Sequence, residues 1–498
     1  MKRQFSTLPV YKAVFKEYVL TLMEEGNYLE FFIEGTRSRN GKTHHPKFGI
    51  LNMVLDAYMQ KRVKNVIFVP VYFSYELMLE SPSHVREMLG ETKKKETTVN
   101  MLKGLTESLT CNFGDIVMQV GEPISLSKYL NDPLHENLRN NRRDLSSKLG
   151  FEITNSLNDN YVALSSHIVS SILLQHLGDV RLSDRRSKIS IESLCDNVLW
   201  LKNELISKGV GVYTNELESS PIAMIERTLS IFSGYIEKKG DNIVVKSSRD
   251  FLMLSIYKNS LAPVFTKESI LLCALHSFRA KDIDFSTVDN IEIQKVDLEE
   301  LKERCAVLGE LLNLEIHPSD MLDTTEKFME CVQDLERREK IACQTDQNKT
   351  SITILDIQYH EFVCSLIWPA LDTYSAVVGY CCMAVNRTTM HSFVFETFVM
   401  EVKYFLEKLF QETSVSYFES VSVLTIKNAI TRFIIWNILH KLSINNVNTI
   451  QIQEYYANQP KELEEWWLMI SLYTKYKQKV NFLSLNESVI PTQRVSKL

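Results

Sequence analysis

The chain has 498 residues, of which 45% are hydrophobic and 24% are charged, as in an ordinary globular protein with two or three domains. Only 16 glycines and 12 prolines are present, which excludes collagen-like and low-complexity classes and favours long helices. The formal net charge of −6 argues against a nucleic-acid-binding protein.

Nine cysteines are scattered along the chain, with no CxxC pair and no spacing that matches histidine ligands. This pattern predicts free thiols in a reducing compartment and no metal site. The most apolar stretch, residues 362–385, is interrupted by Pro369 and Asp372 and falls short of the uncharged run that a membrane span requires. We expect a buried helix pair there rather than a membrane-embedded hairpin.

Residues 1–150 alternate between two kinds of hydrophobic spacing. Helical spacing is found over 10–25, 48–61 and 97–110, and short apolar runs typical of strands are found over 28–33, 66–75 and 115–120. Strands separated by helices predict an α/β domain whose sheet contains parallel strands.

Residues 151–498 are predicted to form a second, mostly α-helical region. Helical spacing recurs over 155–176, 190–207, 221–233, 251–277, 298–312 and 393–412. A strand signal returns only briefly over 242–246, and the polar residues 335–352 are predicted to be a connector. A domain boundary is therefore expected near residue 150.

A basic loop, Glu34–Lys47, follows the first strand-like run. Gly35 lets the backbone turn or approach a ligand closely. Arg37 and Arg39 are two positions apart, so both guanidinium groups can turn toward one phosphate and bind it through charge-assisted hydrogen bonds. By residue type alone, a phosphate site and a merely solvated basic loop are equally compatible with this segment.

Several motifs resemble those of the glycerophosphate acyltransferase family. Phe32–Arg39 (FIEGTRSR) resembles the third conserved block of the family, and its extension through Pro46–Gly49 (PKFG) is similar to the dihydroxyacetone phosphate acyltransferase branch. Val69–Val71, followed by Glu76, resembles the fourth block. Ser255–Phe265 (SIYKNSLAPVF) resembles the tyrosine–asparagine helix that the larger members carry beyond the catalytic domain.

The resemblance implies an α/β acyltransferase domain and transfer of an acyl group from acyl-CoA to the hydroxyl of dihydroxyacetone phosphate, an early step of ether-lipid synthesis. No cofactor is implied beyond acyl-CoA as co-substrate. The family roles carried onto this sequence are phosphate binding for Arg37 and Arg39, shaping of the acceptor site for Glu34, Gly35, Thr36 and Ser38, and acyl-chain or structural support for Val69, Pro70 and Val71.

The family's catalytic base is a histidine followed by aspartate at the fifth position, and none of the eleven histidines here has that partner. We therefore assign no catalytic residue; His44 and His45 have no aspartate nearby and are expected to contact phosphate or solvent. The first five residues, Met1–Phe5, resemble the end of the family's second block. The acyltransferase domain is thus expected to be incomplete at its N-terminus.

The chain ends in Ser496, Lys497 and Leu498, the tripeptide read by the peroxisomal import receptor. It predicts a peroxisomal matrix protein. Because acyl-CoA and the product are amphiphilic and the sequence shows no membrane span, we expect peripheral attachment to the membrane. Alkyl-dihydroxyacetone phosphate synthase is a further partner implied by the pathway. Two alternatives stay open at this point. The chain could use glycerol 3-phosphate as acceptor, or it could be a non-catalytic binding or scaffold protein that lacks the base.

Overall fold

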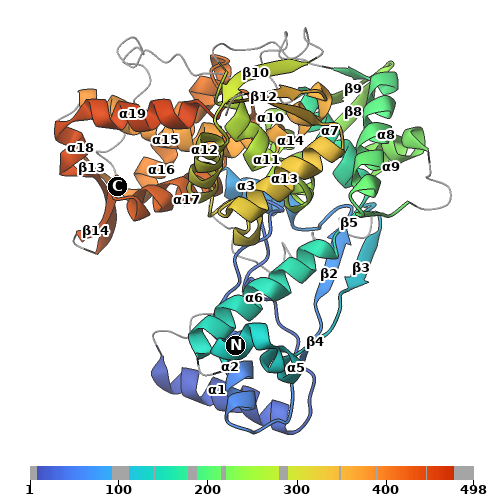
Figure 1. Cartoon of the computed structure of the whole chain (residues 1–498), viewed down its shortest axis with the longest axis vertical. Coiled ribbons are helices and arrows are strands. Elements are labelled where there is room, and N and C mark those ends of the chain that lie inside the picture. The colour runs from blue at the N-terminus through green and yellow to red at the C-terminus, as the bar shows by residue number, and fades with distance from the viewer. Residues whose placement is uncertain are drawn as a thin grey trace.

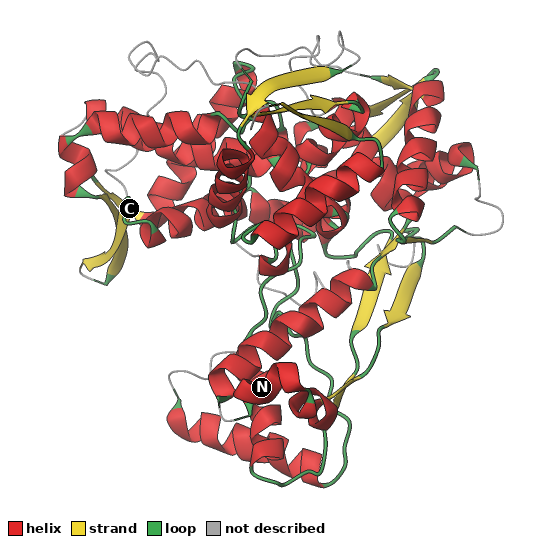
Figure 2. Ribbon diagram, viewed as in Figure 1, coloured by secondary structure: helices red, strands yellow, loops and turns green. Residues whose placement is uncertain are grey.

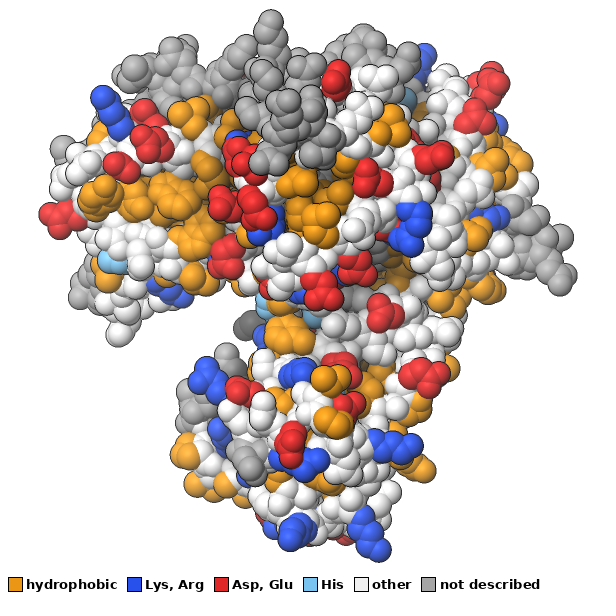
Figure 3. Space-filling view, in the orientation of Figure 1, with side chains coloured by type: hydrophobic (Ala, Val, Ile, Leu, Met, Phe, Trp, Pro, Cys, Tyr) orange, Lys and Arg blue, Asp and Glu red, His pale blue; other side chains and the backbone are white. Residues whose placement is uncertain are grey.

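The computed structural model describes residues 8–91, 111–139, 141–177, 188–214, 220–279, 290–346, 349–387, 391–444 and 446–475. Within them, a small lobe is joined through a narrow waist to a larger part that is mostly helical (Figure 1, Figure 2). The space-filling view shows the same waist between the two parts (Figure 3).

The first part of the chain supplies the small lobe, the waist and one helix of the larger part. Its elements are α1 (Pro9–Glu24), α2 (Phe48–Met59), β1 (Ile67–Phe68), β2 (Val71–Tyr75), α3 (Ser81–Met88), β3 (Ile116–Val120), β4 (Ile124–Ser125), α5 (Leu126–Asn131), the 3-10 helix η1 (Pro133–Leu138) and α6 (Arg142–Asp159). Helices α2, α5 and α6 bury Leu51, Leu55, Leu126, Leu145 and Leu149 completely. This separate leucine core gives the small lobe its cohesion.

The ribbon in the waist is antiparallel. Strand β1 pairs with β4 and β2 pairs with β3, so residues 67–75 run against 116–125 with a break at Val69 and Pro70. The strands expected over 66–75 and 115–120 are confirmed. The expected parallel sheet is wrong for the part of residues 1–150 that the structure describes, because both pairings there are antiparallel.

The strand expected over residues 28–33 is also wrong. The segment has no regular secondary structure, and among the described residues no strand lies beside it to share backbone hydrogen bonds. Instead, the carbonyl of Ile33 accepts a hydrogen bond from the N–H of Lys47 at 2.8 Å, which closes the following loop. Ile33 enters the small-lobe core, whereas Phe32 is 69% exposed. The helix expected over 97–110 lies outside the described residues.

The remaining elements build the larger part around one extensive core. They are β5 (Val162–Ala163), α7 (Ser165–Leu177), β6 (Ile189–Ser190), α8 (Ile191–Ser207), β7 (Gly211–Val212), α9 (Pro221–Ile231), β8 (Ile236–Lys239), β9 (Asn242–Val245), α10 (Ser248–Asn259), α11 (Ala262–His276), β10 (Ile291–Val296), α12 (Leu298–Leu311), η4 (Pro318–Asp320), α13 (Thr325–Arg337), β11 (Ile341–Asp346), β12 (Lys349–Ile354), α14 (Ile357–Ser365), α15 (Trp368–Arg387), β13 (Ser392–Val394), α16 (Phe395–Gln411), η5 (Phe418–Val421), α17 (Val423–Ile435), β14 (Leu439–Ile444), β15 (Val447–Ile452), α18 (Glu454–Asn458) and α19 (Pro460–Ser471).

The helical character expected for this region is confirmed, with several corrections. The helix expected over 155–176 is divided between α6 and α7 by the short strand β5. The expected connector over 335–352 is instead the end of α13 and the hairpin β11–β12, which pairs with β10 in a three-stranded antiparallel sheet. Two further such sheets are present among the described residues: β6-β9-β8, which contains the strand expected over 242–246, and β13-β15-β14, which was not predicted. The expected helix over 251–277 divides at Ser260 and Leu261, because Pro263 lacks an N–H and starts a new helix, α11.

The apolar helices α14 and α15 form the expected buried pair. No single helix among the described residues has the length and composition to cross a membrane, although Ile357–Ser365 and Trp368–Asn386, bent by 53°, meet those criteria together. Both lie in the core of the larger part, where Phe362 and Leu371 are fully buried. Helix α6 runs across residue 150, and the division of the chain into two domains there stays a prediction.

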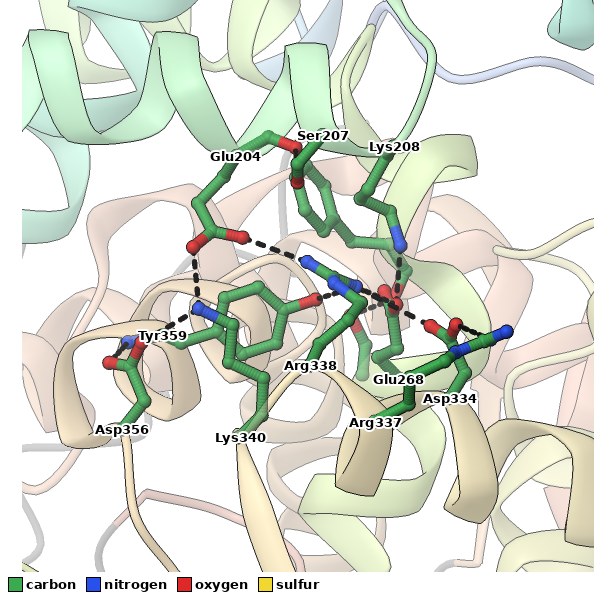
Figure 4. A network of polar contacts seen from close by, with 12 residues as sticks. Glu204, Ser207, Lys208, Glu268, Asp334, Arg337, Arg338, Lys340, Asp356 and Tyr359 are labelled. Atoms are coloured by element: carbon green, nitrogen blue, oxygen red, sulfur yellow. Dashed lines mark hydrogen bonds and ion pairs between the residues drawn. The ribbon is translucent and has the colours of Figure 1, made fainter.

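A cluster of ion pairs ties four helices of the larger part together (Figure 4). The guanidinium of Arg338, at the end of α13, lies 2.8 Å from Glu204 on α8 and 3.0 Å from Glu268 on α11. It also donates to the hydroxyl of Tyr359 on α14 at 3.2 Å. Because these groups are mostly shielded from water, their attraction is less screened than that of surface pairs, and the cluster fixes the mutual positions of the four helices.

Candidate functional site

The basic loop Glu34–Lys47 lies at the waist and is closed at its base by the hydrogen bond between Ile33 and Lys47. Gly35 has a φ of +69°, a conformation that glycine adopts without steric cost, and its N–H donates to the carbonyl of Phe32 at 2.9 Å. The chain turns sharply there, so Thr36 and Arg37 project from the surface as exposed residues. The expectation that this segment is a loop is confirmed.

Both arginines of the loop face helix α3. Arg37 forms an ion pair with Glu80, the residue that precedes α3. Arg39 forms a second ion pair, in which its Nε lies 2.5 Å from a carboxylate oxygen of Glu87. The two guanidinium groups therefore point toward the same short helix, Arg37 toward its start and Arg39 toward a position about two turns further on.

His84 lies between the two glutamates on α3. Its side chain is 7% exposed, and its Nδ1 has no hydrogen-bond partner within the described residues. Burial lowers the pKa of His84, and the charges of Glu80, Glu87, Arg37 and Arg39 all act on it. A neutral imidazole in this place can offer one N–H or one lone pair to a bound ligand.

The loop keeps its shape through its own polar side chains. Ser38 donates from its hydroxyl to the carbonyl of Lys42 at 2.7 Å, and the side-chain oxygen of Asn40 accepts from the N–H of Lys42 at 3.2 Å. Gly41 has a φ of +80°, and a Cβ there would lie 1.8 Å from the carbonyl oxygen of Ile256 on α10. Only glycine fits this contact, so α10 packs directly against the backbone of the loop.

Helix α10, which contains the tyrosine–asparagine motif, also holds α3. The hydroxyl of Tyr257 accepts from the N–H of Met78 at 3.0 Å and lies 2.8 Å from the hydroxyl of Ser81, at the start of α3. Asn259 contacts Asn40 in the loop. Helix α10 thus positions both the loop that carries Arg37 and Arg39 and the helix α3 that these arginines face.

A second set of contacts ties the loop to the segment that follows α12 and to the end of α6. Lys42 lies 2.7 Å from the buried carboxylate of Glu315, which also accepts from Asn428 at 2.9 Å. His45 donates to the carbonyl of Ile316 at 3.3 Å, and Thr43 contacts Asn158 on α6 at 2.7 Å. His45 is thereby occupied in anchoring the loop, and its expected contact with phosphate or solvent stays a prediction.

Glu34 lies at the base of the loop with a carboxyl that is largely buried. Burial raises its pKa to about 7, although a hydrogen bond from the backbone N–H of His44 partly offsets the effect. Its charge acts on Tyr72 of β2, which places the ribbon beside the loop. Near neutral pH this carboxyl exists in both protonation states and can donate to or accept from a bound ligand.

The residues expected to form the acyl block, Val69, Pro70 and Val71, lie in the ribbon, at the break between β1 and β2 and at the start of β2. Pro70 is buried, and its carbonyl accepts from the N–H of Gly121 at 2.9 Å, while Val69 is half exposed and Val71 is partly buried. Glu76, at the end of β2, is buried against Arg227 of α9, whose Nε lies 2.8 Å and 3.0 Å from the two carboxylate oxygens. Glu76 therefore fixes the ribbon to the larger part.

The structure brings Glu34, Gly35, Thr36, Arg37, Ser38 and Arg39 together in one loop, with β2 beside it. Glu80, His84 and Glu87 were missed from the sequence. The available signal was their spacing of four and three residues, which places all three on one face of a helix, next to the helix start at Ser81-Pro82. The terminal residues Ser496, Lys497 and Leu498 lie outside the described residues.

The chain resembles characterised acyltransferases along most of its length. The human dihydroxyacetone phosphate acyltransferase is 25% identical over 493 residues, which cover 91% of this chain and 66% of that protein. The mouse protein of the same name is 25% identical over 509 residues, covering 93% and 67%. The glycerol-3-phosphate acyltransferase of Pasteurella multocida is 28% identical over 287 residues, covering 56% and 35%.

Two family models match the chain in succession. The model described as "Acyltransferase" matches residues 3–74, which include the arginine loop. The model of the glycerol-3-phosphate acyltransferase C-terminal region matches residues 84–441, well over half of the chain. The chain spans just under two thirds of the length of the human relative that it matches. It belongs to the glycerol-3-phosphate acyltransferase family.

Proposed function

We propose that this chain binds the acceptor in an O-acyl transfer from acyl-CoA to the hydroxyl of dihydroxyacetone phosphate. The observation that carries the proposal is the pairing of Arg37 and Arg39 on one loop, with both guanidinium groups turned toward α3. Two guanidinium forks that turn toward one ligand would suit a phosphate group, and the loop is anchored through Gly41, Lys42 and Thr43, as a site that orients a substrate requires.

The reaction would join the acceptor's hydroxyl oxygen to the thioester carbonyl carbon, break the carbon–sulfur bond and release the thiol of coenzyme A. The hydroxyl proton must pass to a base. In this chain, Arg37 and Arg39 would hold the acceptor's phosphate, and Glu34 would lie close enough to the loop to contact the rest of the acceptor. The family's histidine–aspartate block, which resemblance assigns to the base, has no match in this sequence.

The test is acyl transfer with radiolabelled acyl-CoA and dihydroxyacetone phosphate. We expect residues 1–498 to bind the acceptor and to turn it over about 10²- to 10⁴-fold more slowly than a chimera in which the family's His-x4-Asp block is placed before Met1. Absence of acceptor binding, or equally low activity in a folded chimera, would contradict the proposal. Robust activity of residues 1–498 without the added block would identify another residue as the base.

Dihydroxyacetone phosphate is favoured over glycerol 3-phosphate by two observations. The relatives named dihydroxyacetone phosphate acyltransferase match 91% to 93% of the chain, against 54% to 56% for the bacterial glycerol-3-phosphate acyltransferases. The PKFG extension of the loop resembles the first group as well. Parallel titrations with the two acceptors decide between them; tighter binding of glycerol 3-phosphate would reverse the assignment.

A non-catalytic binding or scaffold role is the second candidate, and the unmatched histidine–aspartate block favours it. The chimera separates the two roles. A chain that evolved away from catalysis has no reason to keep a productive acyl-CoA site, so it would bind the acceptor but stay inactive when the block is supplied.

We further propose that the protein acts in the peroxisomal matrix, peripherally bound to the membrane. The terminal tripeptide supports the location. Deletion of Ser496–Leu498 from a fluorescently tagged chain should leave it in the cytosol, whereas unchanged peroxisomal fluorescence would show that the tripeptide is not the signal. The import receptor and alkyl-dihydroxyacetone phosphate synthase are the proposed partners, and co-purification with and without the tripeptide tests the first.

A further inference from the structure

The two arginines of the loop are already neutralised by carboxylates of the same chain. Glu80 pairs with Arg37, and Glu87 pairs with Arg39. A carboxylate and a phosphate make the same kind of contact with a guanidinium group, through oxygens that accept from its N–H donors. The phosphate of an acceptor and the two glutamates therefore compete for the same donors.

The competing pairs are weak enough to be displaced. The side chain of Arg37 is 66% exposed and that of Arg39 is 43% exposed. Ion pairs that water can reach contribute little stability, because solvent screens the attraction and the long side chains lose mobility when they pair. A phosphate dianion carries more charge than either carboxylate, whereas a singly charged carboxylate ligand offers no more than the glutamate that it would replace.

His84 supplies an independent reason to place a ligand here. It is almost completely buried between the two ion pairs, and its Nδ1 has no hydrogen-bond partner in the part of the chain that the structure describes. Buried polar nitrogens normally have a partner, so this atom lacks one that a bound group could supply once Glu80 and Glu87 are displaced.

From these contacts we propose that the acceptor's phosphate binds beside His84 on α3, where it displaces Glu80 from Arg37 and Glu87 from Arg39, so that the two glutamates restrict the site to dianionic ligands. The inference rests on the proposed function, since it needs the two arginines to be the phosphate site. Glu80 and Glu87 are then selectivity residues. They lower the affinity of the site for every anion, and only a dianion attracts the arginines strongly enough to displace them.

The experiment is isothermal titration of the full chain with dihydroxyacetone phosphate and with glycerate, a carboxylate of similar size, at pH 8. Glu80→Gln/Glu87→Gln keeps the side-chain shape and removes both competing charges. We expect it to bind dihydroxyacetone phosphate about three- to tenfold more tightly than the unmodified chain and to gain measurable affinity for glycerate. Glu91→Gln is the matched control, because Glu91 lies just beyond α3 and pairs with Arg249 instead; its affinity should change less than twofold.

Two further variants locate the effect. Arg37→Ala/Arg39→Ala should abolish measurable binding of dihydroxyacetone phosphate. Adding Glu80→Gln and Glu87→Gln to this variant should not restore the binding. His84→Leu retains the volume of the buried side chain and should weaken binding of dihydroxyacetone phosphate about three- to tenfold. Thermal melting of each variant verifies that it is folded.

The outcomes separate this inference from the proposed function. If the unmodified chain binds dihydroxyacetone phosphate through the arginines but the double glutamine variant binds it equally or more weakly, the glutamates position the arginines and the inference is overturned while the proposed function stands. If His84→Leu binds as the unmodified chain does, the placement beside His84 is overturned. If binding is independent of Arg37 and Arg39, the phosphate assignment fails and the inference fails with it.

Discussion

The side-chain amide of Asn259 donates a hydrogen bond to the backbone carbonyl of Asn40 at 2.7 Å, although the two residues are 219 positions apart in the chain. The contact joins the tyrosine–asparagine helix to the arginine loop. This gives a physical reason why the tyrosine–asparagine motif occurs together with the loop. The backbone carbonyl of Asn40 needs a hydrogen-bond donor, and Asn259 of α10 supplies it.

Asn259→Ala should weaken acceptor binding by several-fold and lower the free energy of unfolding by about 1–2 kcal/mol, because it leaves the partly buried carbonyl of Asn40 without its donor. Titration with dihydroxyacetone phosphate and urea denaturation measure the two effects. Asn458→Ala, at the exposed end of α18, is the control and should change neither quantity appreciably. Equal behaviour of the two variants would show that the contact has no influence on the loop.

Arg37→Ala, tested in an active form of the protein, should mainly impair use of the acceptor and leave the affinity for acyl-CoA nearly intact. Loss of a charge-assisted phosphate contact costs on the order of 2–4 kcal/mol of transition-state stabilisation, or roughly 30- to 1,000-fold in kcat/KM for the acceptor. Arg37→Lys should recover only part of the loss, because an ammonium group lacks the planar fork. Steady-state kinetics with each substrate varied in turn decide this, and wild-type acceptor kinetics in Arg37→Ala would remove Arg37 from the site.

Gly41→Ala should destabilise the protein severely or prevent the loop from docking. Its Cβ would lie 1.8 Å from the carbonyl oxygen of Ile256, and its φ of +80° is unfavourable for alanine. Gly209→Ala is a matched control, since Gly209 has a φ of +77° but no atom within 4 Å of the added carbon. The control should cost only about 1 kcal/mol, and a similar melting temperature for both variants would contradict the close approach of α10.

His167 predicts a defined pH dependence of stability. Its Nδ1 accepts from the hydroxyl of Tyr161 at 2.7 Å, and its Nε2 donates to the carbonyl of Tyr75 at 3.0 Å, so the folded protein holds the neutral ring. Burial lowers the pKa of His167 to about 4, against about 6.5 when unfolded. Its contribution is complete above pH 6.5 and is lost as the pH falls toward 4, on the order of 3 kcal/mol in total.

Urea denaturation at pH 7.5, 5.5 and 4.5 measures this loss, with His167→Gln as the comparison. The variant lacks the titrating ring, so its stability should fall less between pH 7.5 and 4.5 than that of the unmodified chain. Parallel curves for the two proteins would show that the protonation of His167 is not coupled to folding. His317, whose pKa burial also lowers to about 4, remains in both proteins and contributes equally to each curve.

The sequence predicted the features that depend on local patterns. Helix α2 and strand β2 follow from their hydrophobic spacing, and the loop that holds Arg37 and Arg39 follows from its glycines and charges. The strand expected over 28–33 failed because a strand depends on a neighbour, which no local pattern reveals. The hairpin β11–β12 was mistaken for a connector because its polar residues conceal the alternation typical of a half-buried strand.

The candidate site was only half visible for a related reason. The arginines could be recognised from FIEGTRSR, but the residues that contact the loop could not. Glu315, the partner of Lys42, is 273 positions away, and Glu87, the partner of Arg39, lies in a helix that carries no recognisable motif. Long-range pairing of this kind depends on how the larger part packs against the waist. It becomes apparent only when the backbone is in place.

The anchoring of Lys42 by Glu315 has a consequence for how such proteins can diversify. The residues that would meet the acceptor lie within the first family match, whereas Glu315 and its hydrogen-bond partner Asn428 lie within the second. A chimera that joined the second segment to a first segment without Lys42 would leave the buried carboxylate of Glu315 without its counter-charge, which is electrostatically unfavourable.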